Sequence, residues 1–206
     1  YRTNAQSRSI EEALRKQNIP YKIYGGLSFY QRKEIKDVLA YCRLTINPND
    51  EEALKRIINY PGRGIGNTTI QKLIVTSNTS NISLWELINN LDKYDHKINK
   101  GTCSKIEEFT TLIKSFISQK ENQDAYFLAE HIAKSSGVFN DLYNDKSPEG
   151  VSRFENIQEL LNGLKDFCEN NEENLLANYM RDVALLTNQD NEKKEDFNKV
   201  TLMTVH

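Results

Sequence analysis

The spacing of apolar side chains along this chain predicts a mostly α-helical protein. The clearest stripe runs from about residue 31 to 46, where the inward side chains recur at helical intervals: Ile35, Val38, Leu39, Cys42 and Ile46. Longer helices are expected near 102–119, 124–136, 151–169 and 173–187. Most of the chain is therefore expected to form a multi-helix body.

Helix-start signals divide this body into shorter elements. Ser9 with Glu12, and Ser83 with Glu86, have the spacing of capping boxes, in which a serine hydroxyl accepts the backbone N–H three residues on. Ile10, Ala13 and Leu14 would then form the inward face of the first helix. Asp50 is expected to cap another helix after the Asn47–Asp50 break.

Short β segments are expected near both ends of the chain. Residues 21–24 alternate like a strand and stop at a glycine pair, and residues 200–205 form an apolar, β-favouring run typical of a buried strand. Residues 188–199 are too polar to offset the cost of ordering and are interpreted as a linker. A helical body between two β segments is typical of an insertion into an α/β domain.

Composition narrows the class of protein. The 206 residues are 38% hydrophobic, which is enough for a core, and no apolar run is long enough for a transmembrane helix. No signal peptide is visible, and the three distant cysteines lack metal-ligand or disulfide spacing, so we expect reduced thiols in a cytoplasmic protein. The chain starts at Tyr1 and stops inside a strand-like run, so both ends are expected to be cuts through a larger protein.

Charge is uneven although the net charge is only −2. Residues 1–72 hold 13 Lys/Arg against 7 Asp/Glu, whereas residues 73–206 hold 14 against 22. This polarity fits one end that faces phosphates, although ordinary variation between segments would also produce it.

The Pro61–Gly66 loop carries the most specific local chemistry. Glycines before a helix let backbone N–H groups approach a phosphate closely, and the helix N-terminus adds partial positive charge. Arg63 would add a full charge and Thr69 a hydroxyl. A plain helix–helix turn is the alternative interpretation.

Two further clusters of polar residues have no role that the sequence alone decides. Arg32, Lys33 and Lys36 form a basic cluster beside Phe29 and Tyr30, and a solvated helix face with intrahelical ion pairs would explain it equally well. The group Arg153, Glu155 and Asn156 is expected to bridge helices. No phosphate-binding loop of the GxxxxGK[ST] type and no paired carboxylates suited to magnesium occur, so the chain alone is not expected to hydrolyse ATP.

Several segments, in order, resemble the UvrD/PcrA/Rep type of superfamily-one DNA helicases. Tyr1–Arg8 resembles motif IV, 24–37 resembles the segment that follows it, and Leu202–His206 resembles the start of motif V. Asn59–Gly66 and Arg153–Asn156 also stand in the order of that family. The resemblance covers essentially the whole chain.

The resemblance implies a four-part organisation. Residues 1–20 would start the second motor domain, 21–187 would form its helical 2B-like insert, 188–199 a flexible linker and 200–206 a strand re-entering the motor domain. The parent protein would be a 3′-5′ DNA helicase that uses ATP and Mg²⁺. Its partners would be single-stranded and duplex DNA, the remaining motor domains and repair proteins, with no membrane.

The resemblance also implies residue roles. Arg2 would be an arginine finger that stabilises charge on the γ-phosphate, and Tyr1 would stack on the adenine. Duplex DNA would be gripped through its phosphates, independently of base sequence, by the residues of the loop and the helix after it: Arg63, Gly64, Ile65, Gly66 and Thr69. Thr204 and His206 would line the single-strand track.

Two other interpretations remain open. One is a non-catalytic DNA-binding or protein-interaction module that never belonged to a motor. The other is part of a helicase–nuclease fusion, in which a nuclease domain would follow His206.

Overall fold

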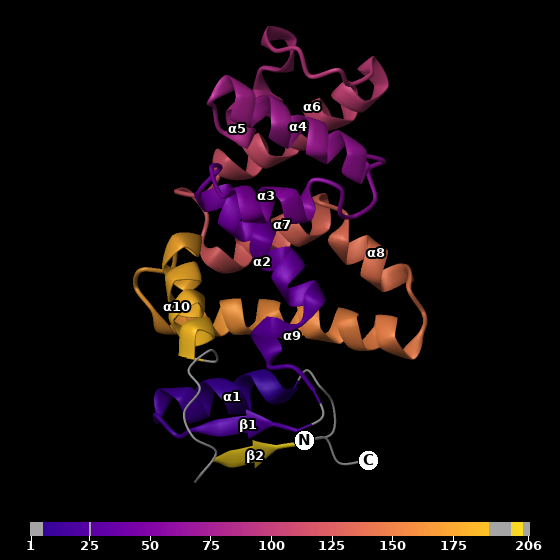
Figure 1. The fold of residues 1–206 in the computed structure, drawn as a ribbon. Coiled ribbons are helices and arrows are strands. Elements are labelled where there is room, and N and C mark those ends of the chain that lie inside the picture. Colours follow the sequence, from indigo (N-terminus) through magenta and orange to yellow (C-terminus); the bar gives the residue numbers. More distant parts are fainter. Residues whose placement is uncertain (1–5, 25, 190–198, 204–206) are drawn as a thin grey trace.

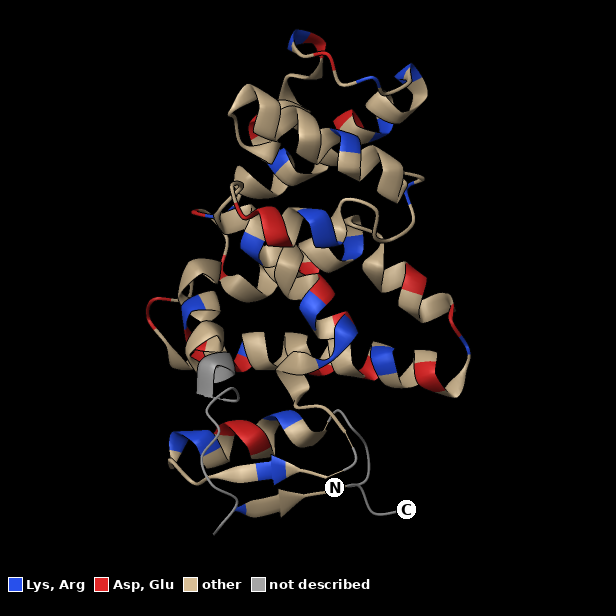
Figure 2. Ribbon diagram, viewed as in Figure 1, with Lys and Arg blue, Asp and Glu red and all other residues tan. Residues whose placement is uncertain are grey.

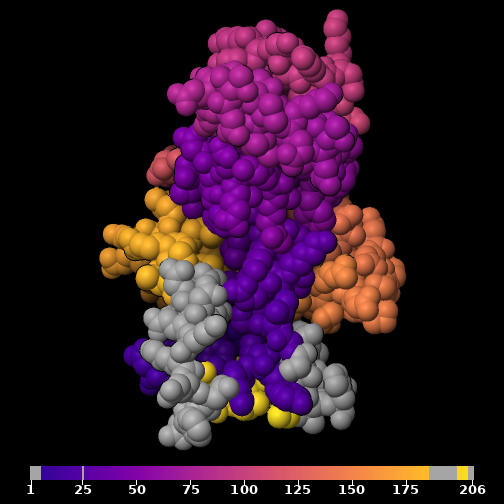
Figure 3. All heavy atoms as spheres, viewed as in Figure 1, coloured from indigo at the N-terminus to yellow at the C-terminus, as the bar shows by residue number. Residues whose placement is uncertain are grey.

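The structure, a computed structural model, describes residues 6–24, 26–189 and 199–203. These residues form ten α-helices and two short strands, which confirms the mostly α-helical prediction. The helices form an elongated body, and a small unit of α1, β1 and β2 lies at one end of it (Figure 1). The space-filling view shows indigo and yellow atoms, from the two ends of the sequence, together at the bottom of the molecule (Figure 3).

Helix α2 (Lys33–Ile46) is the centre of the core. Ten of its 14 residues are buried, including the predicted stripe from Ile35 to Cys42, while Ile46 is half-buried. Five helices pack around it: α3 (Glu51–Ile57), α6 (Lys100–Ile117), α7 (Ala125–Ser135), α9 (Pro148–Asn170) and α10 (Leu176–Gln189). A helix surrounded on several sides has few positions left for solvent, which explains its near-continuous burial.

Helices α4 (Asn67–Ser80), α5 (Leu84–Asn89) and α6 form the end of the body farthest from the strands, and α3 lies between this end and α2 (Figure 1). Two predicted caps are confirmed here. The Asp50 carboxylate accepts the Ala53 N–H at 2.9 Å, and the Ser83 hydroxyl accepts the Glu86 N–H at 3.1 Å. A short 3₁₀ turn, η3 (Leu91–Lys93), leads from α5 towards α6.

Helix α8 (Val138–Asn144) was not predicted. It has only seven residues, its N-cap Gly137 lies in the left-handed region (φ 87°), and it buries just Val138 and Leu142. Such a short helix gives little periodic signal, and packing against α7 and α9 decides its formation.

Strand β1 (Tyr21–Ile23) pairs in parallel with β2 (Val200–Leu202), with Tyr21 opposite Val200 and Ile23 opposite Leu202. Both predicted β segments therefore exist. The interpretation of the second as a buried strand is wrong for this chain, because Val200 is 43% exposed and only Leu202 is buried. Most of the predicted linker, 190–198, lies outside the described residues, and α10 continues to Gln189.

Helix α1 (Ser7–Lys16) differs from its prediction in both its start and its inward face. It starts two residues before Ser9, which is not its N-cap. Its buried side chains are polar or charged: Ser7, Arg8, Glu11 and Arg15. By contrast, Ile10 and Ala13 are exposed and Leu14 is half-buried. Hydrogen bonds to the neighbouring elements turn this polar face inward.

Arg8 makes the main connection between α1 and α9. Its Nε donates to Glu159 at 2.8 Å and its Nη2 to Asp166 at 3.2 Å, while Nη1 donates to Glu12 on its own helix at 3.0 Å. The guanidinium is thereby surrounded by three carboxylates, although Arg8 is only 5% exposed. Such a buried cation needs these partners, since desolvation would otherwise be costly.

Arg32 makes a second polar connection and corrects the view of it as part of a surface cluster. Its Nη1 donates to Asn156 Oδ1 at 2.8 Å and its Nη2 to the Ser7 hydroxyl at 2.7 Å, and Arg32 is only 8% exposed. Asn156 in turn donates to Glu34 at 2.6 Å, so Asn156 bridges α9 and α2 as predicted. Lys33 and Lys36 are exposed, and Glu34 is not paired with either in this network.

Candidate nucleic-acid interface

The loop between α3 and α4 holds most of the predicted DNA-binding residues. Its shape is fixed by Asn59, whose Oδ1 accepts the N–H groups of Arg63 at 3.0 Å and of Ile65 at 2.9 Å. Ile65 is fully buried and anchors the loop in the core. Gly64 between them has φ +73°, a conformation that favours glycine, and it is exposed.

The Arg63 guanidinium points into the protein. Its Nη1 donates to the carbonyl oxygens of Ile57 at 3.1 Å and Tyr60 at 2.7 Å, and its Nη2 donates to the Ser136 carbonyl at 3.0 Å. It also stands over the Phe109 ring, 5.4 Å from its centroid. Arg63 thus joins the loop to the end of α7 and to α6, a geometry that the sequence did not indicate.

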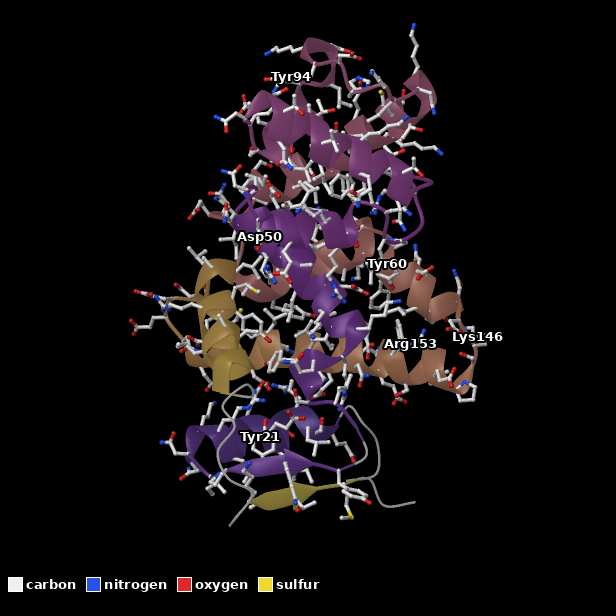
Figure 4. All side chains as sticks on the ribbon, viewed as in Figure 1. Tyr21, Asp50, Tyr60, Tyr94, Lys146 and Arg153 are labelled. Carbon is white, nitrogen blue, oxygen red and sulfur yellow. The ribbon has the colours of Figure 1, made fainter. Side chains whose placement is uncertain are left out.

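Tyr41 completes the attachment of this loop to α2. Its hydroxyl accepts from Arg63 Nη2 at 2.7 Å and donates to the Tyr60 carbonyl. Burial raises the pKa of Tyr41 to about 12, although the neighbouring Arg63 charge opposes the shift. Tyr60 itself lies where α3 passes into the loop, close to α8 (Figure 4).

Helix α4 starts directly after the loop with an open N-terminus. Its N-cap is Gly66, which has no side chain to accept a hydrogen bond. The Thr69 N–H bonds back to the Gly66 carbonyl at 2.9 Å, but the N–H groups of Asn67 and Thr68 belong to the first turn, which has no partners inside the helix. Gly66 and these two residues are exposed, and Thr69 is half-buried, so this end can accept an anion.

Lys105 on α6 lies beside the loop and was missed in the sequence. A Cβ placed on Gly64 would stand 2.6 Å from Lys105 Nζ, so the ammonium rests against the glycine backbone. Lys105 is exposed. No local signal could have found it, because 40 residues separate the two positions and only the packing of α6 brings them together.

Tyr1, Arg2, Thr204 and His206 lie outside the described residues. Within the described ranges, no group of three or more His, Cys, Asp or Glu side chains could hold a metal ion. In the same ranges, no helix combines the length and apolar character needed to cross a bilayer.

Part of the positive charge of residues 1–72 is buried, since Arg8, Arg15 and Arg32 are only 5%, 7% and 8% exposed. Several of its cations are engaged by carboxylates in ion pairs of 2.6–3.6 Å: Arg8, Arg15, Arg43, Lys55 and Arg56. Blue and red positions accordingly alternate along α1, α2 and α3 (Figure 2). Net charge along the sequence therefore overstates the basic surface of this half, and the exposed Lys105 comes from the acidic half.

Comparison with known proteins identifies the family to which this helical body and its small strand unit belong. The family model of the UvrD-like helicase C-terminal domain matches residues 1–206. The chain belongs to that family.

Curated relatives agree with this assignment. The chain is 38% identical over 208 residues to the ATP-dependent DNA helicase PcrA of Staphylococcus aureus (strain COL), and equally to that of Staphylococcus epidermidis (strain ATCC 12228). Each match covers 100% of this chain and 28% of the relative. The chain thus spans a little over a quarter of the length of these relatives.

Proposed function

We propose that this chain is the duplex-gripping insert, with flanking edges of the second motor domain, of an ATP-dependent 3′-5′ DNA helicase. The observation that carries the proposal is the open N-terminus of α4, with the exposed Gly64 and Gly66 before it and the Lys105 ammonium beside it. Backbone N–H groups, a helix dipole and a cation together suit a phosphate group.

The predicted loop residues divide into contacts and supports under this proposal. Gly64, Gly66 and Thr69 remain proposed phosphate contacts through backbone N–H groups or the Thr69 hydroxyl. Arg63 and Ile65 act as positioning residues, because the first donates to internal carbonyls and the second is fully buried. Contact with phosphates alone would make binding independent of base sequence.

The end formed by α1, β1 and β2 supports the assignment to a motor-domain edge. Exposed apolar side chains gather on these elements and their flanks: Ile10, Tyr24, Leu27, Val200 and Met203. Parallel strands occur almost only in sheets that are covered on both faces. We therefore propose that this two-stranded sheet continues into the rest of a motor domain, which would cover these side chains.

The nucleotide and single-strand roles are proposed for the full-length protein. Arg2 would approach the γ-phosphate of ATP as an arginine finger and Tyr1 would stack on the adenine, while Mg²⁺ would be held by residues other than those described. Thr204 and His206 would donate to phosphates of the translocating strand. DNA repair is the process in which we expect this helicase to act, with repair proteins as partners.

Duplex binding by the full-length protein tests the proposal. Fluorescence anisotropy with a labelled duplex–single-strand junction, over a series of salt concentrations, gives the slope of log K against log [salt]. Lys105→Ala should weaken binding and reduce the magnitude of that slope by about 0.9, the contribution of one neutralised phosphate.

Lys114→Ala is the matched control, because it removes an exposed lysine from the same helix without approaching the loop. Identical affinities and slopes for wild type, Lys105→Ala and Lys114→Ala would contradict a duplex contact at this loop. The single-strand affinity of all three proteins should be the same.

A further inference from the structure

A second feature of α4 lies beyond its N-terminus. A groove of about 580 Å³ runs along the outer face of this helix, where the connection between η3 and α6 lies against it. Residues with donors that suit an anion line both sides of it: Thr68, Lys72 and Thr76 on the helix, and His96 and Lys97 on the connection. This part of the molecule lies at the end opposite Tyr21, as the position of Tyr94 shows (Figure 4).

The far wall of the groove is held in shape by hydrogen bonds. Lys72 Nζ donates to the Lys97 carbonyl at 2.8 Å, which fastens the connection to α4. The Ile98 N–H donates to His96 Nδ1 at 3.0 Å, and Lys97 adopts a left-handed conformation with φ 48°. The groove is therefore shaped by contacts within the protein, and a ligand would not have to order this wall.

The side chains of the groove favour an anionic ligand that accepts hydrogen bonds from hydroxyl groups. Lys72 and Lys97 line the groove against one carboxylate residue, Asp95. Thr68 and Thr76 add hydroxyls on the helix side, whereas the Thr79 hydroxyl donates to the Val75 carbonyl at 2.8 Å. Val75, which is 62% exposed, is the large apolar side chain on this wall. A partner helix would need a wider apolar stripe than one valine provides.

We propose that this groove binds the phosphate backbone of the same duplex, further along from the Gly64–Gly66 loop. The inference rests on the proposed function. Thr68 is two residues beyond Gly66, and Thr68 to Thr79 spans about 16 Å at about 1.5 Å per residue. One strand of a duplex carries one negative charge per about 3.4 Å of the duplex axis, so a backbone that follows α4 would bring several phosphates past the two lysines.

Duplex length gives a direct test in the full-length protein. Lys72→Gln combined with Lys97→Gln removes both charges, and glutamine keeps a side-chain N–H at position 72. The test compares junctions with a short duplex arm, long enough only for the loop contact, with junctions whose arm also covers α4. On the long arm the double variant should lower the magnitude of the salt slope by about 1.8, or about 0.9 for each lost phosphate contact. On the short arm it should match the wild type.

The double variant Lys114→Ala/Lys165→Ala is the control, since it removes two exposed lysines from other helix faces. Equal slopes for wild type and the glutamine double variant on both arms would overturn the groove proposal. If Lys105→Ala still weakens binding in that experiment, the proposed function stands without it. Thermal unfolding of the double variant and an intact short-arm affinity show that a long-arm loss does not come from misfolding.

Discussion

The guanidinium of Arg8 lies against the backbone of α9 at Gly163. A Cβ at Gly163 would stand 2.6 Å from Nη1 and 2.9 Å from Cζ of Arg8. Glycine inside a helix normally costs about 1 kcal/mol relative to alanine. Here it lets a buried cation on α1 come close enough to reach Glu159 and Asp166, one on each side of Gly163 along α9.

Gly163→Ala should therefore destabilise the protein despite the better helix propensity of alanine. We expect a loss of about 1–3 kcal/mol, because the added methyl group overpacks the site and displaces the Arg8 side chain. Urea unfolding followed by circular dichroism measures the loss. Gly101→Ala in α6 is the control, since its Cβ would meet only Asn99 Oδ1 at 3.6 Å. Equal stability of the two variants would contradict a close Arg8–Gly163 packing.

Asn156→Leu should be among the most destabilising single changes in α9. It removes the amide that bridges the buried Arg32 and Glu34 side chains, and the loss of a hydrogen bond from a buried group costs about 1–3 kcal/mol. Asn171→Leu, at the exposed end of the same helix, should change stability by less than about 0.5 kcal/mol. Denaturant midpoints of the two variants check this, and a small effect at 156 would mean that water replaces the amide.

The stability that the Asp50 cap contributes to the start of α3 should depend on pH. Burial opposes ionisation, but hydrogen bonds from Arg43 and from the Ala53 N–H together hold the pKa of Asp50 below its ordinary value. A depressed folded-state pKa adds stability above the unfolded-state value, and this stability is lost as pH falls through the folded value. Asp50→Ala should cost about 1 kcal/mol at neutral pH, as loss of an N-cap does.

The same variant should converge with the wild type in acid. Unfolding free energies measured from pH 7 down to pH 3 would show the difference shrinking as the wild-type carboxylate takes up a proton. A difference that stays constant over this range would show that the Asp50 charge contributes nothing to stability.

Arg63→Ala should weaken duplex binding by a similar factor for all base sequences without changing the salt slope. Its guanidinium donates to the Tyr60 and Ser136 carbonyls, so removal loosens the loop but takes no charge from the DNA contact. A direct phosphate contact would instead reduce the magnitude of the slope by about 0.9. Arg63→Lys should not restore affinity, because one ammonium cannot make the same set of divergent hydrogen bonds.

The pairing of β1 with β2 also bears on the boundary of the insert. The predicted division at residues 20 and 21 places β1 in the insert, yet β1 pairs along its whole length with β2, the strand predicted to re-enter the motor domain. We propose that the insert starts after residue 23. Limited proteolysis of the full-length protein should then leave 7–23 associated with the motor domain.

The sequence by itself determined the helical character of the body, the α2 stripe, the Asp50 and Ser83 caps and the two β segments. These features depend on local periodicity and on side chains that bond to their own backbone, so neighbouring residues carry the information. The ordered motifs also indicated the family, because each is a short contiguous pattern.

Tertiary structure alone decided which face of α1 is buried, that Arg32 and Arg63 point inward, and that Lys105 reaches Gly64. In each case the partner lies far away along the chain: Glu159 for Arg8, Asn156 for Arg32 and Ser136 for Arg63. From sequence alone, a charged side chain is predicted to lie on the surface. It can be buried only where a distant element supplies the hydrogen bonds that offset its desolvation. Only the packing of the helices brings those partners within reach.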